Sequence, residues 1–546
     1  MKRIITLISL ALAMTMQVIA QDWRDELLSS NAGVIDSIIS VQDTSYVSDN
    51  FRSYMIYYKQ PLNHDAPDEG TISLRALFIT NLMGGNFVDN MIQMSIGGYE
   101  LDKSIVKSPD SWAEYSGFTK SMGELIGNFG HLLMPEHRFY GESCPKDFAQ
   151  YLSHCNAKEA AADFHALSEA IKKVFHGKWL MSGVSKGGMA TAIQHAYYPD
   201  DADCYVCYVA PFIDGTNDLR PQEYWLSKSW TPELRDHALH IQKEILNRPT
   251  VKEYVIDNIL FHLDPDEIRD QCEFLQNTVC LLDAYSHQYT DRDSIEDIFS
   301  SNKKILEERG LSDYSDEMLE YMVNNHSYAL DSGFVKFEKF ENLIDEDENT
   351  STTRSGSAPS DFKQDDVFSF QCVTELGYFG INWDYYYNTK AEADSVADMW
   401  NSYLPNSLCL NSSEYLRTLE YDPSVMNFVK QKITETKKPI LFLYGEDDPW
   451  TGAAIDDEYV NGDNVRKFIL PAQCHTASLF KILPSDSALS DEIRSFIDKA
   501  LSTHASAISS ISADETNSDI YDLNGRRMNG VPERGIFVQK GKKVIK

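Results

Sequence analysis

Basic residues are scarce in this chain of 546 residues. Lysine and arginine together number 49, against 83 aspartates and glutamates, which gives a formal net charge of -34. Such an acidic surface argues against nucleic acids and anionic membranes as partners, because both would repel it. The excess of carboxylates is more typical of the solubilising surface of an exported protein.

Long apolar runs are missing after the first twenty residues, so nothing later in the chain is predicted to span a bilayer. At the start, Met1, Lys2 and Arg3 precede a short apolar run and a small-residue site near residues 18–20. This pattern predicts a secretory signal peptide over residues 1–20. We therefore expect an exported protein, in the periplasm, at the cell surface or outside the cell.

Spacings typical of metal sites are also absent. Cys204 and Cys207 form a Cys-x-x-Cys pair, but they lie in an apolar, strand-like run with no second pair nearby. They are predicted as core residues on opposite faces of a strand. Cys272 and Cys280 are the pair that we would test first for a local disulfide. No metal and no organic cofactor is expected.

The most informative stretch is residues 183–187, Gly-Val-Ser-Lys-Gly, which ends an apolar run and precedes a helical pattern. Gly-x-Ser-x-Gly between a strand and a helix indicates a nucleophile elbow, in which a sharp turn lifts the serine clear of the sheet. The flanking glycines suit a crowded backbone. The pattern predicts Ser185 as a nucleophile and the amide of Lys186 as a donor to an oxyanion.

An acid and then a histidine are expected downstream of such a serine, each in a loop after a strand. Residues 439–445 are predicted as a buried strand, and the turn that follows carries Asp447 and Asp448. Residues 465–470 are predicted as the next strand, and His475 follows it. Spacing alone does not separate the two neighbouring aspartates.

Composition and periodicity divide the chain into five parts. These are the signal peptide at 1–20, a first core part at 21–213, a helical insertion at 214–436, a second core part at 437–501, and a linker with a short tail at 502–546. Strands that alternate with helices in the core parts indicate a mostly parallel sheet. The insertion is predicted to form a cap, with a mobile polar loop near 345–366.

Two further stretches follow predicted strands. Gly98 and Tyr99 come after the apolar run 91–96, and their amides suit the second half of an oxyanion hole, with a plain turn as the equal alternative. Residues 136–143 follow the strand predicted at 131–135 and place a glutamate, a histidine and an arginine in one turn. A charged scaffold beneath the site is favoured there over a direct catalytic role.

These motifs match known families. Residues 183–189, Gly-Val-Ser-Lys-Gly-Gly-Met, with Tyr-Pro-Asp at 198–200 and Tyr-Val-Ala-Pro at 208–211, closely resemble the secreted tripeptidyl aminopeptidases, serine peptidase family thirty-seven. The chain is also similar to family twenty-eight, that of prolylcarboxypeptidase and dipeptidyl peptidase II. That similarity lies at residues 60–64, 136–143, 371–375 and 445–450.

The resemblance covers roughly residues 50–500. It implies an α/β-hydrolase core with an inserted helical cap, and a serine exopeptidase with a Ser-Asp-His triad. Carried over by position, the nucleophile falls on Ser185, the acid on Asp448 and the base on His475. Lys186 stands where family twenty-eight has an aromatic residue, which argues against a strict post-proline specificity.

An aminopeptidase must also bind an ammonium group, which calls for a carboxylate at a fixed distance from the nucleophile. Glu375 is the first candidate, because relatives place this run against the active site. Asp214, just after the strand beyond the elbow, is the second. For each, a structural salt bridge is the alternative.

The sequence therefore predicts a secreted serine exopeptidase that releases short peptides, most of all tripeptides, from free N-termini. Peptides are the expected partners, and the oligomeric state stays open. The alternatives are a post-proline di- or carboxypeptidase and an esterase on the same fold. A different class is an inactive hydrolase-like binding protein. The tail loosely resembles the sorting segments of type IX secretion.

Overall fold

The computed structural model describes residues 23–41, 51–82, 87–101, 130–249, 252–253, 264, 267–281, 292, 296, 366–403, 414–482 and 486–502, and in the tail 520–521, 527–528, 536–539 and 542–545. The predicted signal peptide and almost all of the predicted loop near 345–366 lie outside these residues. Contacts divide the chain into two units, Met1–Leu501 and Ser502–Lys546.

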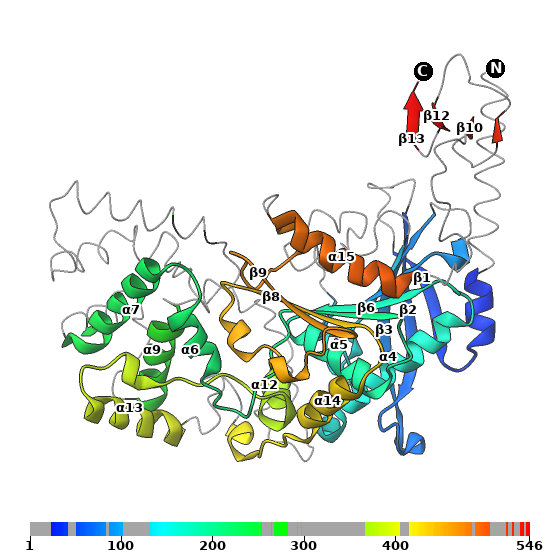
Figure 1. Cartoon of the computed structure of the whole chain (residues 1–546). Coiled ribbons are helices and arrows are strands. Elements are labelled where there is room, and N and C mark those ends of the chain that lie inside the picture. Colours follow the sequence, from blue (N-terminus) through cyan, green and yellow to red (C-terminus); the bar gives the residue numbers. More distant parts are fainter. Residues whose placement is uncertain are drawn as a thin grey trace, which may run out of the picture. The chain divides into compact units, whose positions relative to one another are not determined.

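The first unit is built on one nine-stranded sheet (Figure 1). Its strands are β1 (Ile35–Ser40), β2 (Phe51–Pro61), β3 (Thr71–Asn81), β4 (Ile92–Ile96), β5 (His131–Pro135), β6 (Trp179–Val184), β7 (Cys204–Tyr208), β8 (Ile440–Gly445) and β9 (Val465–Leu470). In space they follow the order β1-β2-β3-β5-β4-β6-β7-β8-β9. The strands β1, β2, β3 and β5 pair antiparallel, and all later pairs are parallel. The predicted mostly parallel sheet is thus confirmed.

The first unit also contains helices from both predicted core parts and from the insertion. They are α4 (Ala157–Lys172), α5 (Lys186–Tyr197), α6 (Arg220–Ser227), α7 (Pro232–Asn247), α9 (Ile268–Leu281), α12 (Asp366–Gln371), α13 (Lys390–Tyr403), α14 (Ser424–Glu435) and α15 (Ser487–Leu501). A π-helical turn, η7 (Cys372–Leu376), continues α12.

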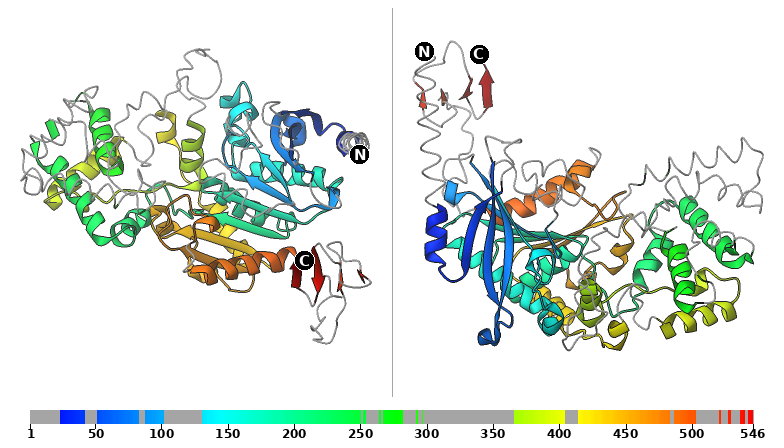
Figure 2. Two further views of the ribbon diagram at one scale, coloured as in Figure 1. Left: turned by 90° about the horizontal axis from the view of Figure 1, so that it is seen from above. Right: turned by 180° about the vertical axis from the view of Figure 1, so that it is seen from behind.

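Different helices cover the two faces of the sheet (Figure 2). Met181 of β6 and Cys207 of β7 belong to the core under α4, α5 and α14. Leu180 and Cys204, on the same two strands, belong to the core under α15. The alternation follows from the two-residue period of a strand, and both cysteines are buried, as predicted.

The first and last helices of the predicted insertion both pack on core elements. Its first helix, α6, packs closely on the turn η10 (Pro449–Ala453), where a Cβ on Gly452 would lie 2.2 Å from Arg220 O. Its last helix, α14, contributes Val429 and Ile433 to the same core as α5. The end of the predicted insertion therefore packs as part of the α/β core.

The predicted Cys272–Cys280 disulfide is wrong. Cys272 is a free thiol, and both residues lie in α9. At about 1.5 Å of rise per residue, eight residues of helix separate the two Cα atoms by roughly 12 Å, well beyond disulfide reach.

The second unit forms a small antiparallel sheet in the order β11-β10-β12-β13. Its strands are β10 (Ile520–Tyr521), β11 (Arg527–Met528), β12 (Ile536–Gln539) and β13 (Lys542–Ile545). Within the described residues, no helix is long and apolar enough to cross a membrane.

Candidate active site

Ser185 alone connects β6 to α5, because the strand ends at Val184 and the helix begins at Lys186. Its φ of 58° lies in the left-handed region, which non-glycine residues rarely adopt. The strained turn is held by a hydrogen bond of 2.9 Å from Ser185 N to Tyr208 O. The strand, sharp turn and helix predicted around Ser185 are therefore present.

The two glycines of the motif let the helix and the neighbouring strand approach this turn. A Cβ on Gly183 would lie 2.1 Å from Gly187 O, and a Cβ on Gly187 would lie 2.2 Å from Ile96 O. Neither position has room for a larger residue, which explains the Gly-x-Ser-x-Gly spacing.

His475 lies between Ser185 and Asp448. Its Nδ1 is 2.7 Å from Asp448 Oδ2, and its Nε2 is 2.9 Å from Ser185 Oγ. An ionised carboxylate can only accept a hydrogen bond, so Nδ1 carries the ring proton and donates a hydrogen bond to Asp448. Nε2 of the neutral ring is then left to accept from the Ser185 hydroxyl. Asp448 is 0% exposed and His475 2%, so their interaction is little weakened by water.

Asp447 was the other candidate for the acid of the triad. Its side chain contacts different partners. Arg292 Nε donates to Asp447 Oδ2 over 2.8 Å, and Trp230 N donates to Asp447 Oδ1 over 2.8 Å. Arg292 also pairs with Glu446 at 3.2 Å. Asp447 therefore ties the turn after β8 to the insertion, whereas Asp448 contacts the histidine.

The loops that carry the acid and the histidine are fastened to each other. Asp447 N donates to Gln473 O over 2.8 Å, and Ala472 N donates to Glu446 Oε2 over 2.9 Å. A Cβ on Gly445 would lie 2.3 Å from Gln473 O. This close contact fixes the distance between Asp448 and His475.

The predicted oxyanion residues lie together at the start of α5. Gly98 has a φ of 85°, and a Cβ there would lie 2.9 Å from Gly187 N and 3.1 Å from Lys186 C. The glycine is needed both for its left-handed backbone and for this contact. The turn that follows β4 therefore packs directly on the first helical residues after Ser185.

Glu375, the first candidate for binding a substrate amine, caps a helix. Both of its carboxylate oxygens accept from Ala157 N, the first residue of α4, at 2.9 and 3.1 Å. Burial raises the pKa of this carboxyl to about 7, although the Ala157 amide and Lys186 act in the opposite direction. These contacts support a structural role for Glu375, which is the alternative to binding a substrate amine.

Asp214, the second candidate, has a 57% exposed side chain beside two cations. Lys430 Nζ donates to its Oδ1 over 2.7 Å, and Arg220 Nη2 lies 3.1 Å from its Oδ2. Its described contacts are therefore those of a salt bridge.

The charged scaffold predicted at residues 136–143 is present. Arg75 binds Glu136 through two hydrogen bonds of 2.9 and 2.7 Å, and Arg138 binds Asp163 through two of 2.6 and 2.8 Å. All four side chains are buried, so each charge is neutralised by its partner. The sequence did not predict the roles of Arg75 and Asp163, because each lies far from its partner in the chain.

The sequence also did not predict a row of half-buried aromatic rings. Tyr99, Phe368, Tyr378 and Trp450 contact one another in turn, with ring centroids 5.6, 6.2 and 5.9 Å apart. Trp450 then lies 6.4 Å from the ring of His475. The row runs from the Gly98 turn to the histidine and offers an apolar surface beside Ser185.

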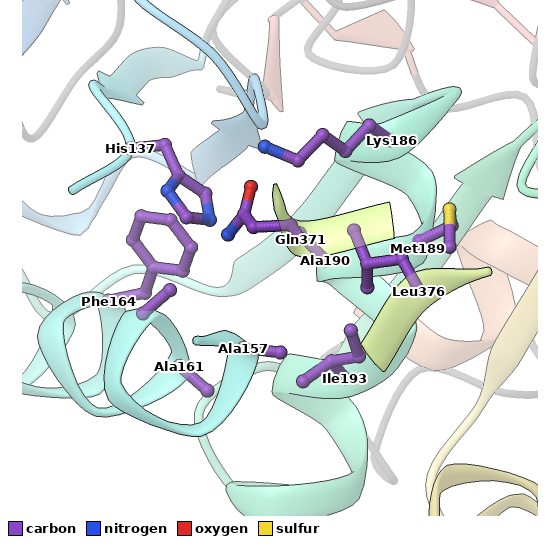
Figure 3. A pocket seen from close by; sticks show the side chains of 11 residues that line it. His137, Ala157, Ala161, Phe164, Lys186, Met189, Ala190, Ile193, Gln371 and Leu376 are labelled. Carbon is purple, nitrogen blue, oxygen red and sulfur yellow. The ribbon is translucent and has the colours of Figure 1, made fainter. Parts of the chain in front are cut away.

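Behind the elbow lies a cavity of 20 Å³, lined by His137, Lys186, Gln371 and apolar residues of α4 and α5 (Figure 3). The polar ends of these three side chains gather on one side, opposite Ala161 and Ile193. Such a volume holds about one water molecule. It is too small for a substrate side chain.

One group among the described residues has the composition of a metal site. His165, Glu169 and Asp201 place their ligand atoms within 4.8 Å of one another. However, Lys172 Nζ lies 2.9 Å from Glu169 and 3.7 Å from Asp201, so a positive charge already occupies the space.

Comparison with known proteins points to a peptidase family. The family model of PS-10 peptidase S37 matches residues 17–260. A prolyl tri/tetrapeptidyl aminopeptidase from Streptomyces mobaraensis is 22% identical over 441 residues, which cover 78% of this chain and 76% of that protein.

Two solved structures show lower similarity. The peroxisomal alpha-beta-hydrolase Lpx1 from Saccharomyces cerevisiae is 9% identical with a TM-score of 0.35, over 83% of this chain and 90% of that chain. A carboxyl esterase from Bacillus coagulans is 10% identical with a TM-score of 0.31, over 82% and 99%.

Proposed function

The chain belongs to the peptidase S37 family and is a serine peptidase with the α/β-hydrolase fold, and from this premise we propose that it releases short peptides, tripeptides above all, from free N-termini. The observation that carries the proposal is the run of hydrogen bonds from Asp448 through His475 to Ser185. The relative from Streptomyces mobaraensis, whose name describes release of three or four residues, supports the length of the product.

In the proposed reaction, Ser185 Oγ attacks the carbonyl carbon of the scissile peptide bond while His475 Nε2 takes the hydroxyl proton. The tetrahedral intermediate collapses, the C–N bond breaks, and His475 returns the proton to the leaving amine. A water molecule, deprotonated by His475, then hydrolyses the acyl-enzyme and frees the short peptide. Asp448 holds the required tautomer and stabilises the imidazolium throughout.

The negative charge that develops on the carbonyl oxygen needs preorganised donors. We assign this role to the amide of Lys186 and to the amides of the Gly98–Tyr99 turn, which packs against it. A single donor of this kind contributes about 3–4 kcal/mol to transition-state stabilisation. The aromatic row beside it suits an apolar side chain or a proline ring before the scissile bond.

The first test of the proposal is the length of the released fragment. Peptides of about ten residues with a free N-terminus and an apolar third residue are incubated with the protein, and products are identified by mass spectrometry. The proposal predicts an N-terminal fragment of three residues as the main product. Release of single C-terminal residues would support a carboxypeptidase instead, and turnover of simple esters alone would support an esterase.

Recognition of the free amine supplies a second prediction, for Glu375. The Ser185→Ala variant is expected to bind a tripeptide product without chemistry, and adding Glu375→Gln should weaken that binding about 10- to 100-fold, the loss of one charged hydrogen bond. Because burial raises the Glu375 pKa to about 7, affinity should rise as the pH increases through 7 only while Glu375 is present. Calorimetric titration measures both effects.

The N-acetylated tripeptide is the matched ligand control and Asp214→Asn the matched variant. Acetylation removes the positive charge, so Glu375→Gln should leave the affinity for the acetylated ligand unchanged. If Asp214→Asn weakens binding of the free tripeptide and Glu375→Gln does not, the amine is bound by Asp214. If neither substitution matters, both assignments are wrong.

A further inference from the structure

Lys186 carries two groups that point to different neighbours. Its backbone amide begins α5 directly after Ser185, whereas its side chain is buried, with 4% of the residue exposed. Its Nζ donates to Gly98 O and, over 2.8 Å, to Tyr140 Oη. The proposed reaction uses only the amide, so the buried amine needs a separate explanation.

Three aromatic rings lie close to Nζ. The rings of Tyr140, Tyr99 and Phe368 lie 4.0, 4.7 and 5.8 Å from it. Burial lowers the Lys186 pKa to about 7, while Cys155, Cys372, Glu375 and Glu100 raise it. An ammonium and a neutral amine both carry N–H groups, so Nζ can donate to Gly98 O on either side of pH 7.

The bond to Gly98 O has a consequence for the next amide. The Gly98 carbonyl and the Tyr99 N–H belong to one planar trans peptide, so they point in opposite directions. Fixing the carbonyl on Nζ therefore turns the Tyr99 N–H away from the lysine. The following carbonyl, Tyr99 O, accepts from His137 N over 3.0 Å. These two bonds hold consecutive carbonyls of the turn.

We propose that the Lys186 side chain is a positioning residue: it orients the Gly98–Tyr99 peptide so that the Tyr99 N–H and the Lys186 amide receive the same oxyanion. One residue thus supplies one donor directly and aligns the other. This inference rests on the proposed function for the identity of the substrate, but not for its test.

The test compares wild type with Lys186→Met, which keeps the amide and the approximate shape of the side chain. Misplacing one of two donors should lower kcat about 10- to 100-fold, somewhat less than complete removal of a donor. KM should stay within about threefold, because the bound substrate does not yet carry the oxyanion that these donors stabilise. Inhibition by a tripeptidyl boronic acid, which forms a tetrahedral adduct, should weaken in parallel with kcat.

Two other variants separate positioning from stability. Tyr140→Phe removes the second acceptor of Nζ and should give the same pattern with a smaller loss. Thr191→Val removes another buried hydrogen bond of α5, from Thr191 Oγ1 to Gly187 O at 2.8 Å, and should lower the melting temperature without changing kcat. If Lys186→Met does not fold, Tyr140→Phe carries the test.

The rate of labelling by a fluorophosphonate extends the test to any substrate, because the phosphoryl oxygen also needs the oxyanion donors. We expect folded Lys186→Met to be labelled at least about tenfold more slowly than wild type. Equal rates of labelling, or an unchanged kcat, would overturn the inference while leaving the proposed function intact. Labelling without peptide hydrolysis in wild type would overturn the proposed function alone. Absence of both would overturn the two together.

Discussion

Replacing Ser185 by alanine should lower kcat/KM for peptide hydrolysis by roughly 10⁴- to 10⁶-fold, which corresponds to about 5–8 kcal/mol of transition-state stabilisation. The hydroxyl oxygen is the atom that forms the acyl-enzyme, and His475 Nε2 lies 2.9 Å from it, within reach of its proton. The variant should also lose labelling by a fluorophosphonate. Its melting temperature should change little, because the backbone bond to Tyr208 remains.

Ser182, three residues earlier in β6, is the matched control. Its hydroxyl is buried and accepts from Gln93 Nε2 over 2.7 Å. Ser182→Ala should cost about 1–3 kcal/mol of stability, since the buried hydrogen bond from Gln93 Nε2 is lost, yet keep labelling and turnover. Full labelling of Ser185→Ala would place the nucleophile elsewhere in the chain.

The second large effect separates two adjacent aspartates. Asp448→Asn should lower kcat about 10⁴-fold, because an amide can donate to Nδ1 and so favour the tautomer that cannot accept the Ser185 proton. Asp447→Asn should leave kcat within about tenfold, since Asp447 contacts Arg292 and Trp230 rather than His475. Steady-state kinetics on both variants measures the contrast.

Thermal unfolding supplies the opposite contrast for the same pair. Asp447→Asn leaves the Arg292 guanidinium without its buried anion, so it should destabilise the protein by about 3–5 kcal/mol. A folded Asp447→Asn that has lost catalysis, beside an active Asp448→Asn, would show that the acid is Asp447.

The parts of the fold that could be predicted are those with local signals. The strand at residues 440–445 is a continuous apolar run, the strand at 465–470 begins and ends on buried apolar residues, and the elbow has two glycines whose Cβ positions are blocked. The antiparallel β1 at Ile35–Ser40 carried no comparable signal, since only its first residue is buried.

Features that depend on contacts between residues far apart in the sequence could not be predicted. Asp447 and Asp448 are chemically identical neighbours, and partners elsewhere in the chain separate their roles: Arg292, 155 residues away, contacts Asp447, whereas His475 contacts Asp448. Glu375 was found from its local run, but its partner Ala157 lies 218 residues away. The amide of Lys186 follows from its position after the serine, whereas the direction of its side chain depends on Gly98 and Tyr140 from two other loops.

The most direct test of the aminopeptidase activity is hydrolysis of a tripeptidyl chromogenic amide with a free N-terminus, measured beside its N-acetylated form, the dipeptidyl amide and a simple acyl ester. We predict that wild type cleaves the free tripeptidyl amide, that acetylation blocks cleavage, and that Ser185→Ala cleaves none of them. Equal cleavage of the free and acetylated amides, or turnover of the ester alone, would contradict an aminopeptidase.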